Sequence, residues 1–313
     1  MALLVAAVIG GGWLWLGSDD GRFFLAEKLA QALSQPGHPA QVEGLTGQPP
    51  FHLRLAHLIV PDSQGDWLSI DNAVLDIDGK ALLRRTLRIE RLTADSITVD
   101  RAPISQPSAA KPSPTSFSLP RLPVALELDN LDIAKINLAP AVLGQGVTAY
   151  LSARASLHEG RANAHVDLHR TDGTGGQLRL DLSYSPDDRL TLALHAAEPT
   201  GLLLAALDPI AGKRPLTLDL AGAGTLSDWS GDLKLTGGKD VRVDSGVLIG
   251  RQRAGLMIKA GGEARIQPLL PVNMRGAAGL AVPFAIGVGI EDGKPLRLDH
   301  LRLHMAAVDV EAG

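Results

Sequence analysis

Two pairs of histidines are the first residues whose spacing could do chemistry. His165 and His169 are four residues apart, as are His300 and His304. On a helix that spacing could hold a metal ion, but both pairs lie where apolar and polar residues alternate, which predicts β-strands. Four strand residues span about 13 Å, too far for two ligands that must each come within about 2 Å of one ion. We therefore interpret them as histidines on a solvent-facing side of a sheet.

Other motifs associated with catalysis are incomplete. The sequence has no Gly-x-Ser-x-Gly, and residues 222–227 (GAGTLS) lack the third glycine of a dinucleotide-binding loop, so we interpret their glycines as turn residues. Residues 211–214 (AGKR) lack the hydroxyl and the upstream glycine of a phosphate-binding loop. The paired carboxylates Asp187 and Asp188 lie in a polar turn, where nothing is expected to perturb them. The sequence predicts no enzyme, no cofactor and no metal site.

The composition excludes some classes of binding partner. The chain has 313 residues, of which 45% are hydrophobic, enough for a core of one or two domains. Its net charge is only −4 and 4% of its residues are aromatic. Without a basic block or aromatic platform, a nucleic-acid partner is not expected. The absence of cysteine excludes disulfides and thiolate metal sites.

The strongest pattern is a strict alternation of leucine with polar residues in residues 178–194. It reads LRLDL, then a turn at residues 185–188 (SPDD), then LTLAL, and it returns at residues 216–220 as LTLDL. Successive strand side chains point to opposite faces, so every leucine shares one face. The leucines expected to line this apolar face are Leu178, Leu180, Leu182, Leu190, Leu192, Leu194, Leu218 and Leu220.

Residues 1–17 are predicted to form a transmembrane anchor. Their apolar helix would rise only roughly 22 Å of the ~30 Å hydrocarbon core, so we expect an uncleaved anchor with further residues upstream. A cleaved signal peptide, which lacks its basic start and small-residue cleavage site here, and a buried helix are the alternatives. The expected anchor residues are Leu3, Leu4, Val5, Val8, Ile9, Trp13, Leu14, Trp15 and Leu16.

Residues 18–34 are predicted to form an amphipathic helix, capped by residues 18–20 (SDD), that plugs one end of a sheet or lies on a membrane. Strand patterns then fill residues 41–101 and 124–313. A Pro-rich linker at residues 102–123 separates these two β domains. The pattern is still running at residue 311, so we expect more strands to follow.

The predicted fold is mainly β, an elongated and curled antiparallel sheet. Its apolar face could pack on a second sheet, close as a barrel, or remain a trough. Leucine and alanine with few aromatics suit a fluid ligand better than a tightly packed core. A lipid tail of about 14 methylenes costs roughly 11 kcal/mol to expose to water, and a leucine-lined trough would remove most of that cost.

The chain resembles the TamB family, the translocation and assembly module subunits of the AsmA-like superfamily. The resemblance rests on residues 14–33, 42–55, 67–92 and 224–233, above all on the ALLRRTLRIERL run at residues 81–92. It implies a β-taco or groove, a single-pass anchor in the bacterial inner membrane and a periplasmic body. It also implies phospholipid transport between the inner and outer membranes, and no catalytic residues. Family members are longer, and their partner, a TamA-like outer-membrane barrel, would bind through C-terminal residues absent here.

Three functions are therefore weighed. The first is a phospholipid conduit along the leucine-lined face. The second is an assembly factor that offers a strand edge to outer-membrane proteins or autotransporters, by strand augmentation. The third, a parallel β-helix adhesin or polysaccharide enzyme, requires a fixed repeat and a carboxylate cluster, and neither is present.

Overall fold

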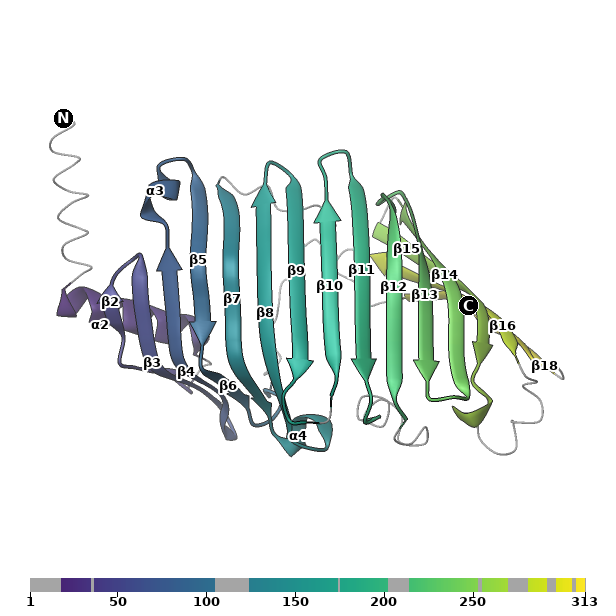
Figure 1. Cartoon of the computed structure of the whole chain (residues 1–313), viewed down its shortest axis with the longest axis horizontal. Helices are drawn as coiled ribbons and strands as arrows, with labels where there is room; N and C mark the ends of the chain where they lie inside the picture. Colours follow the sequence, from purple (N-terminus) through teal and green to yellow (C-terminus); the bar gives the residue numbers. More distant parts are fainter. Residues whose placement is uncertain are drawn as a thin grey trace. The chain divides into compact units, whose positions relative to one another are not determined.

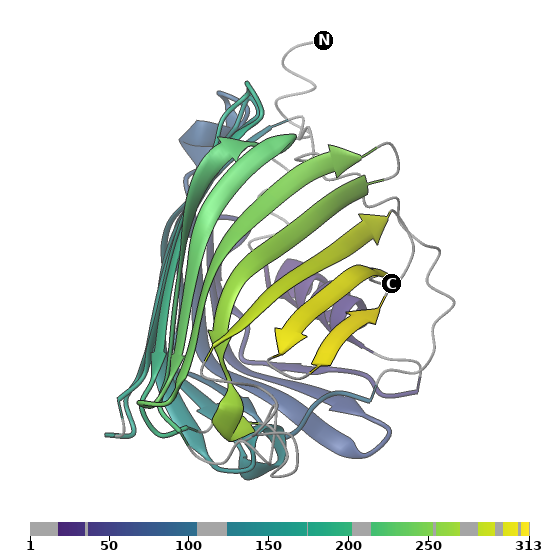
Figure 2. The ribbon, with the colours of Figure 1, turned by 90° about the vertical axis from the view of Figure 1, so that its right-hand side faces the viewer.

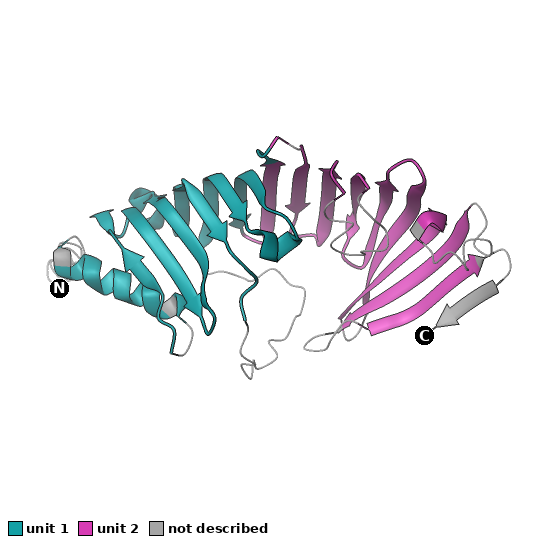
Figure 3. Ribbon diagram, turned by 90° about the horizontal axis from the view of Figure 1, so that it is seen from below, with its two compact units in different colours: residues 1–106, 123–158, 170–172 teal, residues 107–122, 159–169, 173–313 magenta. Residues whose placement is uncertain are grey.

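The computed structural model describes residues 18–34, 37–104, 124–173, 175–201, 214–252, 255–269, 281–291, 297–305 and 308–312. The chain is mainly β. It divides into two compact units, coloured separately in Figure 3. The first unit contains the described residues of 18–104, 124–158 and 170–172. The second unit contains residues 159–169 and the described residues from 173 onward.

The first unit begins with a helix, α2 (Asp19–Leu33). The Ser18 hydroxyl accepts a hydrogen bond from the Gly21 N–H at 3.3 Å, which confirms the predicted cap. Leu25 is half-buried, whereas Leu29 and Leu33 are each 38% exposed. The helix packs beside β1. Among the described residues, no helix is both long and apolar enough to cross a bilayer.

The strands of the first unit are built around β3, and their labels follow Figure 1. Strand β3 pairs with β1, β2 and β4, and β4 pairs with β5 and β6, all antiparallel. Between β4 and β5 lies the short helix α3 (Gly79–Leu82). The strand bounds are β1 Gln41–Glu43, β2 Thr46–Gln48, β3 His52–Asp62, β4 Gly65–Ile77, β5 Thr86–Ala94, β6 Ser96–Val99, β7 Ala125–Leu138 and β8 Val147–His158. A further short helix, α4 (Pro140–Leu143), lies between β7 and β8.

Strand β7 departs from the predicted antiparallel sheet. It pairs antiparallel with β8 but parallel with β5 and β6, so the sheet is not wholly antiparallel. Its pairing with β8 shifts register between Leu128 and Leu131 and again between Ile133 and Ile136. The long Pro-rich segment before β7 allows a parallel return, which a short hairpin cannot make.

The second unit is a regular antiparallel ladder. Each strand from β9 to β18 pairs with the next one along the chain. Figure 2 shows its strands, in green to yellow, as neighbours in a curving sheet. The bounds are β9 Arg161–Arg170, β10 Gln177–Tyr184, β11 Arg189–Glu198, β12 Leu216–Thr225, β13 Asp228–Gly237, β14 Val241–Gln252, β15 Gly255–Arg265, β16 Val282–Glu291, β17 Arg297–Met305 and β18 Val308–Ala312. This antiparallel pairing contradicts a parallel β-helix.

Some predicted segments fall outside the described residues. They are the anchor at residues 1–17 and most of the Pro-rich linker. After β15, Gln267–Leu269 form a 3-10 turn.

A candidate apolar binding face

Cross-strand register sets which side chains of the second unit share a face. Directly paired residues point to the same side of a sheet. One such row starts at Val166 in β9 and continues through Leu180, Leu194, Leu220 and Leu233 on the next four strands. Parallel rows run on either side of it. We call this side the apolar face, made up of the residues in these rows. In order along β9 to β15 they are Ala162, Ala164, Val166, Leu168, Leu178, Leu180, Leu182, Tyr184, Leu190, Leu192, Leu194, Ala196, Leu218, Leu220, Gly222, Gly224, Trp229, Gly231, Leu233, Leu235, Val243, Ser245, Val247, Ile249, Ile258, Ala260, Gly262 and Ala264.

All eight leucines that the sequence singles out lie on the apolar face. Leu180 is opposite Leu194, which is opposite Leu220, and Leu182 is opposite Leu192. All eight are half-buried. Leucines on three adjacent strands therefore form one continuous apolar surface, and their side chains remain partly exposed to solvent.

The opposite face is polar and exposed. Arg179 donates to the Asp167 carboxylate at 2.9 Å, from directly across the β9–β10 pair. His165 Nδ1 lies 2.6 Å from Asp181, and His195 Nδ1 lies 2.6 Å from Asp219, again between directly paired residues. The histidines are therefore used as cross-strand partners of carboxylates on this face.

No metal site is formed by these groups. Among the described residues, no group of three or more histidine and carboxylate side chains is placed to hold an ion. His165 and His169 both lie in strand β9, as predicted, and each is near a different carboxylate. His300 lies in β17, where its ring occupies the space beside Gly287.

Two glycines on the apolar face leave no room for a side chain. A Cβ built on Gly262 would lie 2.0 Å from the Asp244 carbonyl oxygen of the neighbouring strand, and one on Gly222 would lie 2.5 Å from the Ser230 carbonyl oxygen. The backbone of the neighbouring strand therefore approaches closely at both positions, which only glycine allows. The prediction that the glycines of residues 222–227 lie in a turn is wrong, because Gly222 and Gly224 lie within β12.

Trp229, for which the sequence predicted no role of its own, fills the space above Gly222 and Gly231. A Cβ on Gly222 would lie 2.4 Å from its Cζ2, and one on Gly231 would lie 2.6 Å from its Cη2. The side chain is 1% exposed, and its buried Nε1 has no hydrogen-bond partner among the described residues. The sequence shows Gly231 two residues from this tryptophan, but the pairing of Gly231 with Gly222 appears only when β12 and β13 are aligned.

The turn between β10 and β11 is more structured than predicted. Asp187 accepts a hydrogen bond from the Ser185 hydroxyl, which lowers the pKa of its carboxyl, so the expectation of an unperturbed pair is wrong. Asp188 accepts from the Tyr184 hydroxyl at 2.6 Å, and its carbonyl accepts from the Leu226 N–H at 3.0 Å. These bonds tie the β10–β11 turn to the β12–β13 turn, beside Trp229.

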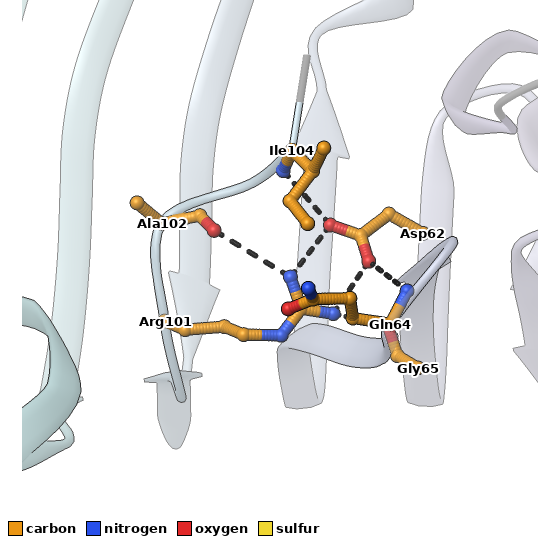
Figure 4. Close-up of polar contacts among 6 residues, drawn as sticks. All are labelled: Asp62, Gln64, Gly65, Arg101, Ala102 and Ile104. Atoms are coloured by element: carbon orange, nitrogen blue, oxygen red, sulfur yellow. Dashed lines mark hydrogen bonds and ion pairs between the residues drawn. The ribbon is translucent and has the colours of Figure 1, made fainter. Parts of the chain in front are cut away.

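The strongest polar cluster lies elsewhere, in the first unit (Figure 4). The Asp62 carboxylate is 1% exposed and accepts from both terminal nitrogens of Arg101, at 2.5 and 2.6 Å. It also accepts from the backbone N–H groups of Gln64 and Ile104, at 2.8 and 2.9 Å. The guanidinium of Arg101 holds the pKa of Asp62 far below its usual range. Every acceptor position is used inside the fold, so we interpret the cluster as a clamp where the chain leaves β6.

Comparison with known proteins adds no assignment: no known family, no curated protein and no solved structure matches the chain.

Proposed function

We propose that the chain carries phospholipids, with their acyl tails lying along the apolar face of the second unit. The observation that supports this is the row of half-buried leucines running without interruption across β10 to β13. Burying about 14 methylenes there would offset roughly 11 kcal/mol of exposure in water. The exposed polar side chains on the other face would keep that side of the sheet in solvent.

The cellular setting is part of the same proposal. Residues 1–17 would anchor the chain in the bacterial inner membrane, and the two units would stand in the periplasm, with lipid moving toward the outer membrane. A TamA-like barrel would be the outer-membrane partner. Trp229 would close the apolar face near the β12–β13 turn, which leaves the leucine rows as the surface for acyl chains.

Paired substitutions on the two faces test the proposal. Leu194→Asp with Leu220→Asp places two charges on directly paired positions of the apolar face, whereas Ala193→Asp with Ala221→Asp places them on directly paired, exposed positions of the other face. The full chain is purified from membranes and its lipids are measured by mass spectrometry. We expect at least about tenfold less phospholipid with the leucine pair, since a methylene contact is worth about 0.8 kcal/mol, and no change with the alanine pair.

Equal lipid content in both variants and the parent would contradict the proposal. If the parent carries no lipid but its edge strands crosslink to outer-membrane protein segments, strand augmentation is the function instead.

A further inference from the structure

The turn between β4 and β5 holds two leucines out in water. The side chain of Leu83 is 88% exposed and that of Leu82 is 41% exposed. Three cations surround them, and Lys80, Arg84 and Arg85 are all exposed. Within the described part of the chain, none of the three forms an ion pair with a carboxylate. We call residues 79–85 the α3 tip.

The α3 tip is a fixed structure. The N–H groups of residues 83–85 donate to the carbonyls of residues 80–82, at 2.9 to 3.2 Å. Asp78 caps the turn by accepting from the Lys80 N–H at 2.8 Å, so this nearby carboxylate is already used. Ala81 is buried and anchors the turn to the unit. The exposed leucines are thus held outward by the fold, which an isolated mobile loop would not do.

We propose that the α3 tip docks on a bilayer surface that contains anionic lipid. Leu82 and Leu83 would enter the region below the headgroups, and the three cations would bind lipid phosphates. Two adjacent leucines are too small a patch for a protein partner, which needs roughly 20–30 residues a side. Within the described residues these three cations have no carboxylate partner, so with the two leucines they suit a surface that is negatively charged outside and apolar inside. Docking does not require that the second unit carries lipid.

The first unit supplies a control at the far end of the same strand. Strand β4 has 13 residues, so its two ends are about 40 Å apart. The α3 tip follows one end, at the top of β4 in Figure 1, and Ser63, an exposed residue of the β3–β4 turn, precedes the other. A docked tip therefore leaves Ser63 well outside the bilayer.

The absence of cysteine allows single-site labelling. The full chain carrying Leu83→Cys or Ser63→Cys is labelled with an environment-sensitive nitrobenzoxadiazole dye and reconstituted with vesicles of phosphatidylcholine and phosphatidylglycerol. Some vesicles also contain a lipid with a nitroxide quencher on its acyl chain. We expect a blue-shifted, quenched signal at position 83 and an unshifted, unquenched signal at position 63.

The charges are tested by adding Lys80→Gln, Arg84→Gln and Arg85→Gln to the Leu83→Cys chain. Each cation near an anionic surface contributes about fivefold, so we expect the three changes to weaken docking by about a hundredfold, with the thermal midpoint unchanged. A label at position 83 that stays as water-exposed as the one at position 63 would overturn the proposal. Equal quenching in pure phosphatidylcholine, insensitive to the three substitutions, would also overturn it.

Discussion

Strand β3 of the first unit and strands β10 and β11 of the second all carry alternating apolar and polar residues, with different outcomes. In β3 the apolar positions Leu55, Leu58 and Val60 are 8%, 5% and 4% exposed. The alternation of β3 breaks between Leu55 and Leu58, yet all three residues join one buried cluster. In β10 and β11, where the alternation is unbroken, the leucines are only half-buried, so alternation alone does not explain the difference.

The difference lies in what packs on each face. In the first unit Ala40 joins the buried cluster of β3, and Trp67 and Leu45 pack against it, so residues outside β3 complete a small closed core. In the second unit Trp229 closes one place on the apolar face, above Gly222 and Gly231. Alternation therefore decides which face is apolar, and residues from outside the alternating strand decide whether that face is closed.

The largest loss of stability should follow from breaking the clamp of the first unit with Asp62→Asn. The amide would face the guanidinium of Arg101 without its negative charge, and the N–H groups of Gln64 and Ile104 would compete for one remaining oxygen. We expect a large drop in the thermal midpoint at neutral pH. Asp66→Asn, at an exposed carboxylate of the same hairpin, should change it little. Equal effects of the two variants would show that the clamp is not a stabilising feature.

The same carboxylate should make the thermal midpoint depend on pH under acidic conditions. The hydrogen bonds from Arg101 are the main cause of the lowered pKa of Asp62, and burial opposes them. A lowered folded pKa gives stability that is present above about pH 4, where the unfolded carboxyl ionises, and is lost as the pH falls further. The thermal midpoint of the parent should therefore fall more steeply below about pH 4 than that of Asp62→Asn. Parallel curves would contradict this assignment.

The next largest loss of stability should follow from removing Trp229, which closes one place on the apolar face. Trp229→Ala leaves an empty space above Gly222 and Gly231, and we expect it to cost about 3–5 kcal/mol in denaturant unfolding. Trp229→Phe keeps a ring over the glycines and should cost clearly less. A cost below about 1 kcal/mol for Trp229→Ala would mean that the indole is not a packed part of this unit.

Truncating one leucine in each unit sharpens the comparison directly. Leu58→Ala, in the closed core of β3, should cost about 2–5 kcal/mol. Leu220→Ala, at a half-buried position, should cost about 1–2 kcal/mol in the absence of lipid, because less apolar area is removed from water. Equal costs in denaturant unfolding would show that the apolar face is packed as tightly as the core.

The smallest loss of stability is expected from a substitution on the polar face. Arg179 holds the pKa of Asp167 below its usual value, so this pair contributes above about pH 4 and is lost as the pH falls. The Arg179 side chain is 61% exposed, and such a pair is worth less than about 1 kcal/mol. Asp167→Asn should therefore lower the free energy of unfolding by less than that, and high salt should remove the difference. A larger, salt-independent loss would contradict the interpretation of this face as solvated surface.

The strands and their apolar face could be predicted from the sequence because period-two alternation is a local property. Short turns join β10 to β11 and β12 to β13, whereas residues 199–215 make a longer connection between β11 and β12. The register of Leu180, Leu194 and Leu220 follows from keeping the leucines on one side.

The features that were missed depend on residues far apart in the chain. The parallel pairing of β7 with β5 is decided by a crossover that no local pattern reveals. Asp62 and Arg101 are 39 positions apart and look like ordinary surface residues in sequence. Gly222 was assigned to a turn because the role of a glycine under a tryptophan appears only when the neighbouring strand is in place.

The most direct test of lipid carriage is a face-specific crosslinking measurement in cells. A photoreactive benzoylphenylalanine is placed in the full chain at Leu180 or Leu220 on the apolar face, or at the adjacent Asp181 or Ala221 on the polar face. After irradiation, the chain is isolated and its adducts are analysed by mass spectrometry. The account predicts phospholipid adducts at the two leucine positions and none at their neighbours. Adducts at both faces alike, or at neither, would contradict it.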